Sequence, residues 1–358
     1  MDASSIITSG DGLCTATAFE QYVSGRRTLG AGAVFFVESG EHVEAVRSQT
    51  RLDDVVFAPA GSARRTDPRV VVYHGSLREP GDEITFDGAH AVGLGEYVMV
   101  PLLSIAGPTL IRQNSAEGVA AFLSDADTAK NSGVFIDALL SNAVLLDSLP
   151  SFLGPIREGE ALARVHVTAE GEYRDGPDGL LLGIVGDGRE EIEVRARECE
   201  GRGRGFARIV DRGVLEADLD DRPWFARYLA AIELLREGDG VPSRPTISGF
   251  GGHLVRALDE LAALSGVVCA SAPYLLTGDG DEWVLVDPPS RRRTRLGVDS
   301  ARAAECLIAT GDESAAVALL AAELGRGTSG VASMVNEVQV RFAAMGLDLT
   351  TSGRECLS

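Results

Sequence analysis

The stretch YLLTGDGDEWVLVDPPSRRRTRLG, residues 274–297, decides the fold of the C-terminal part of the chain. Two apolar runs flank the turn formed by residues 278–281, and this pattern predicts a β-hairpin. After Pro288 and Pro289, the residues RRRTRLG predict a short third strand. The stretch therefore predicts a three-stranded antiparallel sheet.

Three helices are predicted to follow the third strand. They are SARAAECLIA with Asp299 as its cap, SAAVALLAAEL with a capping box of Thr310 and Glu313, and VASMVNEVQVRFAAMG. The third helix carries an apolar stripe at helical spacing, which consists of Val331, Val335, Val338, Phe342 and Met345. A hairpin, a short strand and three helices predict a small winged-helix-like module over about residues 270–350.

The 358-residue chain is too long for one ordinary domain, and its fold class is predicted to be α+β. Strand-rich N-terminal domains are expected to precede the C-terminal winged-helix-like module. Residues 1–155 predict an α+β domain, with a helix that Asn114 caps. Residues 156–240 predict a strand-rich middle domain with EEIEVRAREC and VLEADL as strands, closed by the helix DDRPWFARYLAAIELLRE. Residues 241–358 predict a linker, a helix and the module.

The chain is strongly acidic, with 53 Asp and Glu against 33 Lys and Arg and a net charge of −20. This charge repels phosphate backbones and anionic lipids, so neither nucleic acid nor a membrane is an expected partner. The N-terminal residues lack a signal-peptide pattern, and no apolar run is long enough to span a membrane. The five cysteines lie far apart, so a reducing cytoplasm is the expected location.

No residue pattern predicts a catalytic, metal or cofactor site. Lys130 is the only lysine, and its surroundings lack the glycines of a phosphate-binding loop. None of the five histidines has a metal-ligand spacing, and no serine-nucleophile motif occurs. The histidines are His42, His74, His90, His166 and His253. We therefore expect no catalytic residue, no metal and no cofactor.

Two glycine clusters are candidates for phosphate-binding loops. Residues 183–188 (GIVGDG) precede a predicted strand, so a hairpin turn is favoured over a phosphate site at a helix N-terminus. Residues 248–252 (SGFGG) precede a predicted helix, where an anion is physically possible. Their spacing is not the dinucleotide fingerprint, so a flexible helix entry is the favoured interpretation.

Four arginines stand within five residues of the predicted third strand: Arg291, Arg292, Arg293 and Arg295. One interpretation is that these arginines lie on a solvated edge strand, where charged side chains prevent aggregation. The other is that Arg291–Leu296 bind an extended peptide along the strand, with the arginines pairing acidic residues of that peptide. Met334, Val338 and Arg341 of the third helix would form the wall of the groove, although core packing equally explains Met334 and Val338.

The order of these elements resembles the RiPP recognition element, a winged-helix module that binds the leader of a ribosomally made precursor peptide. The whole chain resembles the recognition proteins of daptide biosynthesis. This resemblance implies a non-catalytic adaptor whose partners are the precursor leader and a modifying enzyme of the alcohol-dehydrogenase type. The adaptor would present the precursor to that enzyme for oxidative decarboxylation. The resemblance also implies that the leader adds as a strand to residues 290–296.

Two alternatives from other classes remain. The chain could be a peptide-modifying enzyme in which the C-terminal module delivers the substrate to the N-terminal domains. It could also be a winged-helix DNA-binding regulator. Against this last alternative, the third helix carries only Arg341 as a cation, which is too little positive charge for a recognition helix.

Overall fold

The computed structural model describes residues 12–62, 67–88, 90–153, 162–237, 246–262, 274–288 and 290–350. The chain divides into two compact units, and each is built from two segments of sequence. The first unit comprises Met1–Phe122 and Ser141–Asp220, and the second comprises Leu123–Leu140 and Asp221–Ser358. The domain boundaries predicted at 155/156 and 240/241 lie outside the described residues.

The first unit contains a ten-stranded sheet in the order β10-β9-β8-β1-β2-β3-β4-β5-β6-β7. β8 pairs in parallel with β1, which sets Arg164 opposite Val34. Residues on both sides of position 155 therefore share one sheet, and the middle segment does not form the separate strand-rich domain that the sequence predicts. The strands are β1 (Val34–Val37), β2 (Val55–Pro59), β3 (Val70–Gly75), β4 (Glu83–Phe86), β5 (His90–Glu96), β6 (Thr109–Arg112), β7 (Val144–Leu146), β8 (Arg164–Val167), β9 (Glu172–Arg174) and β10 (Leu181–Ile184).

The central strand β1 is buried on both faces of this sheet. Val34 and Phe36 pack in one hydrophobic cluster with the helix α1 (Gly12–Ser24). Phe35 and Val37 pack in a second cluster with α2 (Val43–Gln49) and α5 (Arg189–Glu198). A strand between two layers of helices needs apolar residues at every position, which explains the sequence VFFV.

A buried ionic network lies beside the parallel strands of the first unit. Arg164 on β8 is 2 % exposed, and its guanidinium contacts Asp147 at 3.0 Å and Asp175 at 3.2 Å. Arg204 contacts the other oxygen of Asp175 at 2.6 Å. A buried charge is tolerated only when it is paired, so these four side chains depend on one another.

The strands predicted from EEIEVRAREC and VLEADL are wrong, because both segments are helical. They form α5 and α6 (Arg212–Asp220). In α5 the apolar residues alternate along the sequence as they would in a strand. Only Ile192 and Ala196 are buried, however, while Val194 is 43 % exposed. Spacing of four residues, rather than two, therefore determines which side chains reach the core.

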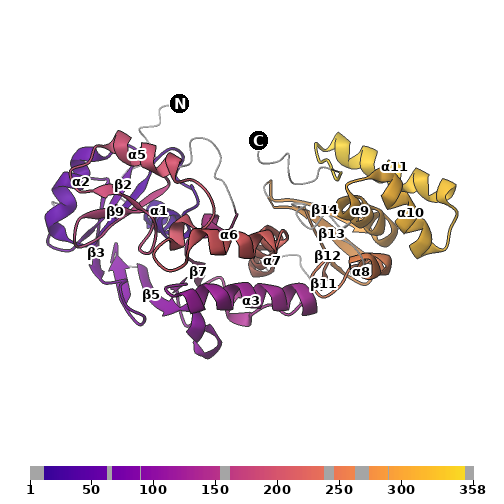
Figure 1. Cartoon of the computed structure of the whole chain (residues 1–358), viewed down its shortest axis with the longest axis horizontal. Coiled ribbons are helices and arrows are strands. Elements are labelled where there is room, and N and C mark those ends of the chain that lie inside the picture. Colours follow the sequence, from indigo (N-terminus) through magenta and orange to yellow (C-terminus); the bar gives the residue numbers. More distant parts are fainter. Residues whose placement is uncertain are drawn as a thin grey trace. The chain divides into compact units, whose positions relative to one another are not determined.

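The second unit contains the sheet β11-β12-β13-β14, and Figure 1 shows α9, α10 and α11 together on one side of it. The predicted hairpin and third strand are present, and β11 adds a fourth strand that the sequence analysis missed. The strands are β11 (Thr246–Ile247), β12 (Leu275–Asp279), β13 (Glu282–Asp287) and β14 (Arg292–Gly297), and the helices are α8 (Arg256–Ala262), α9 (Val298–Thr310), α10 (Glu313–Leu324) and α11 (Thr328–Ala344).

One hydrophobic cluster joins this sheet to its helices. Leu276, Trp283 and Leu285 of the hairpin pack with residues of α8 to α11. The predicted stripe on α11 is confirmed for Val331, Val335, Val338 and Phe342, which are all buried in this cluster. Its fifth member, Met345, follows the last residue of α11 and is only partly buried against the cluster. The core thus lies between the sheet and the helices that follow it.

Three of the predicted helix caps differ in the structure. Ser115, not Asn114, accepts a hydrogen bond from Gly118 N–H at the start of α3 (Ala116–Ser132). Asp312 caps α10 by accepting from Ala315 N–H at 2.7 Å, so the capping box of Thr310 and Glu313 is wrong. Gly297, not Asp299, stands at the N-cap of α9. The remaining elements are α4 (Pro150–Leu153), α7 (Phe225–Glu237) and the short 3₁₀ helices at Gly40–His42, Tyr97–Leu102, Asp137–Leu140 and Arg204–Phe206.

Candidate functional site

β14 forms one edge of the four-stranded sheet. Among the described strands it pairs only with β13, in an antiparallel register that sets Trp283 opposite Leu296 and Asp287 opposite Arg292. The other side of β14 therefore carries backbone N–H and C=O groups that no described strand pairs. The edge strand that the sequence predicts is thus present at residues 292–297.

The pleat of β14 divides its arginines between two faces. Arg293 and Arg295 lie opposite Val286 and Val284 of β13, on the face away from the helical core. Arg292 donates through Nη1 to the carbonyl oxygen of Met345 at 2.8 Å. All three of these arginines are exposed.

The arginines differ in their ionic partners. Arg293 forms an ion pair with Glu237 at the end of α7. The Arg295 guanidinium makes no ion pair or hydrogen bond with any described residue, and the same holds for Arg291. Arg291 lies in the turn before β14 with a left-handed φ of 55°. β14 therefore presents unneutralised positive charge on a chain whose net charge is −20.

The predicted residues of α11 lie largely in the core. Val338 and Leu296 are each 5 % exposed in one hydrophobic cluster, and Met334 packs against that cluster. Arg341 is exposed in the last turn of α11. Of the three α11 candidates, Arg341 alone is exposed, while Met334 is partly buried.

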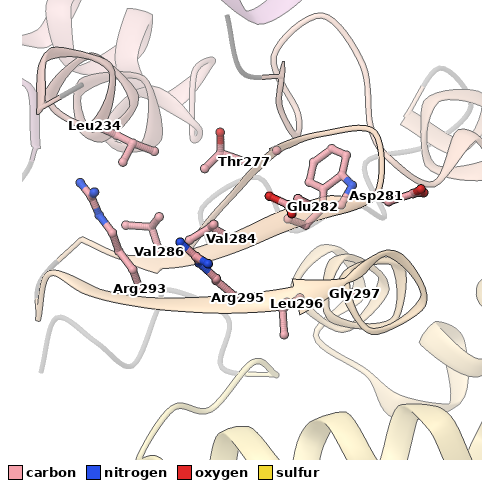
Figure 2. A pocket seen from close by; sticks show the side chains of 12 residues that line it. Leu234, Thr277, Asp281, Glu282, Val284, Val286, Arg293, Arg295, Leu296 and Gly297 are labelled. Carbon is pink, nitrogen blue, oxygen red and sulfur yellow. The ribbon is translucent and has the colours of Figure 1, made fainter. Parts of the chain in front are cut away.

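A pocket of about 560 Å³ opens on the sheet face that carries Arg293 and Arg295 (Figure 2). Val284 and Val286 of β13 and Leu234 of α7 provide its apolar surface. Arg293, Arg295 and Leu296 are thus brought together around one pocket, whereas Met334, Val338 and Arg341 do not line it.

Thr277 and Leu234 are two of the lining residues that were not predicted as site residues from the sequence. Thr277 is 2 % exposed, and its hydroxyl has no hydrogen-bond partner among the described residues. The alternation of side chains within the hairpin sets Thr277 on the same face as Val284. The sequence pattern could therefore have predicted that Thr277 lies on this face. In the α7 sequence the apolar residues Trp224, Tyr228, Ile232 and Leu235 fall at helical spacing. Leu234 does not belong to this stripe, so periodicity gave no signal for it.

The glycine cluster at 248–252 is a helix entry whose donors already have an acceptor. Glu305 of α9 accepts hydrogen bonds from Leu254 N–H at 2.9 Å and Val255 N–H at 2.6 Å, and from the Ser248 hydroxyl. Burial raises the pKa of Glu305 to about 7, although these hydrogen bonds oppose the shift. The protein's own carboxyl group therefore occupies the place that an external anion would take.

The cluster at 183–188 leads into α5, so the strand predicted after it is wrong. Its polar groups are paired within the loop. Asp187 accepts from Ile184 N–H at 3.1 Å and pairs with Arg195 at 2.7 Å, while Glu191 accepts from Gly188 N–H at 3.0 Å. The chain's own carboxylates therefore accept the hydrogen bonds of these backbone N–H groups before α5.

His166 is a buried histidine of the first unit, and both of its ring nitrogens lie close to polar side chains. Its Nδ1 lies 2.8 Å from the Tyr22 hydroxyl, and its Nε2 lies 3.3 Å from Glu38. Burial lowers the pKa of His166. The pKa of Glu38 is lowered to about 2 because hydrogen bonding to His166 and the charges of His166 and Arg78 outweigh burial. Among the described residues no three His, Cys, Asp or Glu side chains group as a metal site.

Comparisons with known proteins give no relative for this chain. No protein-family model, no curated protein and no solved structure matches it. Within the described residues, no helix is both long and apolar enough to cross a membrane.

Proposed function

We propose that the chain is a non-catalytic adaptor that binds a peptide along the free edge of β14. The observation that carries this proposal is an edge strand with three exposed arginines, one of which has no ionic partner among the described residues. An extended peptide can hydrogen-bond to the unpaired backbone of such a strand. Acidic residues of the peptide would pair with the arginines in charge-assisted hydrogen bonds.

The arrangement around β14 supports a module of the RiPP recognition type. The hairpin β12–β13 is followed by β14 and then by three helices, which is the element order of that family's winged-helix module. On this proposal the peptide is the leader of a ribosomally made precursor. The adaptor presents the precursor to a partner enzyme of the alcohol-dehydrogenase type for oxidative decarboxylation.

A binding experiment on the full chain tests the edge-strand site. The probe is a fluorescein-labelled acidic peptide used as the leader, and the readout is fluorescence anisotropy. Arg291→Glu combined with Arg295→Glu is expected to weaken binding at least about tenfold, because two attractive charges become repulsive. Neither guanidinium has an ion pair to lose in the described structure, so folding should be unaffected. Higher salt should weaken wild-type binding as well.

The matched control is Arg256→Glu combined with Arg326→Glu. Both arginines are exposed in the second unit, lie outside β14 and give the same change in net charge. Binding close to wild type is expected. Equal loss of affinity in the two double variants would show that net charge, not the β14 edge, controls binding, and the proposal would be abandoned.

A turnover assay separates the adaptor from a peptide-modifying enzyme. The purified protein is incubated with precursor and, in separate reactions, with divalent metals, nicotinamide cofactors or ATP, and the precursor mass is measured. An adaptor leaves the mass unchanged until a dehydrogenase-type partner is added. A mass change without any partner would contradict the adaptor function.

A further inference from the structure

Glu237, the last residue of α7, makes the two arginines on the face of β14 away from the helical core unequal. Its carboxylate forms an ion pair with Arg293, whereas the Arg295 guanidinium has no ion pair or hydrogen bond with any described residue. In Figure 2 the Arg293 side chain extends toward the helix that carries Leu234, and Arg295 lies farther along the strand beside Val284. The positive charge that this face offers to a ligand is therefore concentrated at Arg295.

The packing of α7 holds Glu237 in place. Leu234 is 4 % exposed and lines the same pocket as Arg293. Glu237 follows Leu234 by three residues, so the two side chains lie on the same side of the helix. Phe225 and Ile232 are also buried and anchor the helix further back. A carboxylate held in this way acts at a high effective concentration, so a carboxylate of a separate peptide does not easily displace it.

Negative charge lies near the other end of the same face. Gly297 of β14 lies opposite Glu282 of β13, and Asp281 precedes Glu282 in the hairpin turn. Both acidic residues are exposed and line the pocket. Because Gly297 has no side chain, it places no group between these carboxylates and a strand added at the edge. An acidic residue of such a strand would be repelled opposite Gly297.

A peptide strand added to β14 would present alternate side chains to this face. Its residues opposite Arg293, Arg295 and Gly297 would be spaced two apart, and each would lie about 5 Å from its β14 partner. They would meet, in order, a guanidinium that Glu237 neutralises, a guanidinium that no described residue neutralises, and a negatively charged end. Only the middle position can therefore pair an acidic side chain without displacing Glu237.

We infer that Glu237 is a specificity-determining residue of the peptide site. The site selects a strand with one acidic residue opposite Arg295 and uncharged residues two positions away on either side. A second acidic residue at this spacing adds no affinity. This inference rests on the proposed function and specifies the pattern of side chains that the bound peptide carries.

Two fluorescein-labelled peptides test this pattern on the full chain by fluorescence anisotropy. Both alternate threonine and glutamine. The first carries one glutamate in place of its central glutamine, and the second carries two glutamates in place of two successive glutamines. Wild type is expected to bind the two peptides with affinities equal within about threefold. A larger preference for the two-glutamate peptide would show that it displaces Glu237, and the inference would be wrong.

Glu237→Gln should create a preference that wild type lacks. Without the Glu237 carboxylate, Arg293 can pair the second glutamate, so the two-glutamate peptide should bind about 5- to 10-fold more tightly than the one-glutamate peptide. Affinity for the one-glutamate peptide should stay within about threefold of wild type, which also shows that the variant is folded. Glu237→Gln combined with Arg293→Gln should lose the preference. Equal affinity of Glu237→Gln for both peptides would contradict the inference.

The matched control is Glu282→Gln, which makes the same chemical change at the other end of the pocket. It removes a repulsive charge but releases no arginine from an ion pair, so the two peptides should again bind equally. The same two-glutamate preference in Glu282→Gln and Glu237→Gln would show that net charge, not the ion pair of Arg293, sets the pattern. That result would overturn the inference.

The outcomes separate this inference from the proposed function. Arg291→Glu combined with Arg295→Glu should weaken the binding of both peptides. Unchanged binding in this double variant would defeat the β14 edge site, and the inference with it. Weaker binding in the double variant, together with no effect of Glu237→Gln, would defeat the inference alone. If neither peptide binds wild type below about 1 mM, both are wrong.

Discussion

Glu305 shows how one buried carboxyl group joins two distant parts of the second unit. It is 3 % exposed on α9, and it accepts hydrogen bonds from the chain just before α8. Its pKa is raised to about 7, because burial penalises the charged form more than the donors stabilise it. Glu305 thus couples the fold of this unit to pH.

The free energy of unfolding should depend on Glu305 between about pH 4.5 and pH 7. In this window the folded protein holds a proton that the unfolded chain has released, so stability falls as pH rises, by about 3 kcal/mol in total. Glu305→Gln should remove this component. Urea unfolding followed by tryptophan fluorescence measures it, since both tryptophans belong to the second unit.

The control for this prediction is Glu260→Gln, which makes the same change on an exposed side chain of α8. Its stability should follow the wild-type pH curve. A Glu305→Gln curve parallel to wild type between pH 4.5 and pH 7 would show that Glu305 is not the coupled group.

The residues of the candidate site were predictable to different degrees. The four arginines were found because their density is unusual on an acidic chain. Glu237 was not singled out, because its ion pair joins it to Arg293, 56 residues later in the chain, and no local pattern records such a partner. Glu305 was missed for the same reason, since its donors lie about fifty residues earlier in the chain.

At the scale of elements, α11 depends on its apolar stripe. Phe342 is fully buried in the cluster that joins the sheet to α9 and α10, so Phe342→Ala should reduce stability by about 3–5 kcal/mol. The urea midpoint of the tryptophan signal measures this change. The loss combines removed burial with the cavity that the ring leaves behind.

Val340 on the same helix provides the comparison. It is 60 % exposed, so Val340→Ala should alter stability by no more than about 0.5 kcal/mol. Similar midpoints for the two variants would mean that α11 does not pack through the stripe described above.

The elements that the sequence predicted well have a single consistent pattern. The hairpin β12–β13 has turn residues between two apolar runs. In α11 the helical spacing runs from Val331 to Phe342, longer than the alternation of Val338, Val340 and Phe342. In α5 two patterns overlap, because alternation at 192, 194 and 196 competes with the spacing from 192 to 196. Packing against the sheet of the first unit decides between them, and that contact is nonlocal.

At the scale of the whole molecule, the second unit includes a segment from the middle of the first. Leu123–Leu140 contributes Lys130, whose Nζ donates to the Gly249 carbonyl at 2.6 Å, and Asp127, which pairs with Arg222 at 2.7 Å. Phe135 stacks on Tyr228 with ring centroids 5.8 Å apart. The order of residues along the chain does not reveal that Leu123–Leu140 belongs to the second unit.

Phe135→Ala should therefore destabilise the second unit although it lies far from that unit's C-terminal segment in sequence. The expected loss is about 2 kcal/mol, from the stack on Tyr228 and the contact with Phe250. The readout is the urea midpoint of tryptophan fluorescence. The neighbouring Val134→Ala, on a side chain that is 61 % exposed, should leave this midpoint unchanged, and equal effects of both would refute the assignment of this segment.

The sequence by itself determined the α+β class, the hairpin, the edge strand with its arginines and the helices that follow, because each rests on local periodicity or turn chemistry. Only the tertiary structure decided that residues on both sides of position 155 share one sheet, and that Leu123–Leu140 belongs to the second unit. It also paired Glu237 of α7 with Arg293 of β14, which lines one pocket together with Leu234 of α7. The physical reason is that strand pairing and side-chain burial join residues far apart in the chain, and no local pattern records which partners they find.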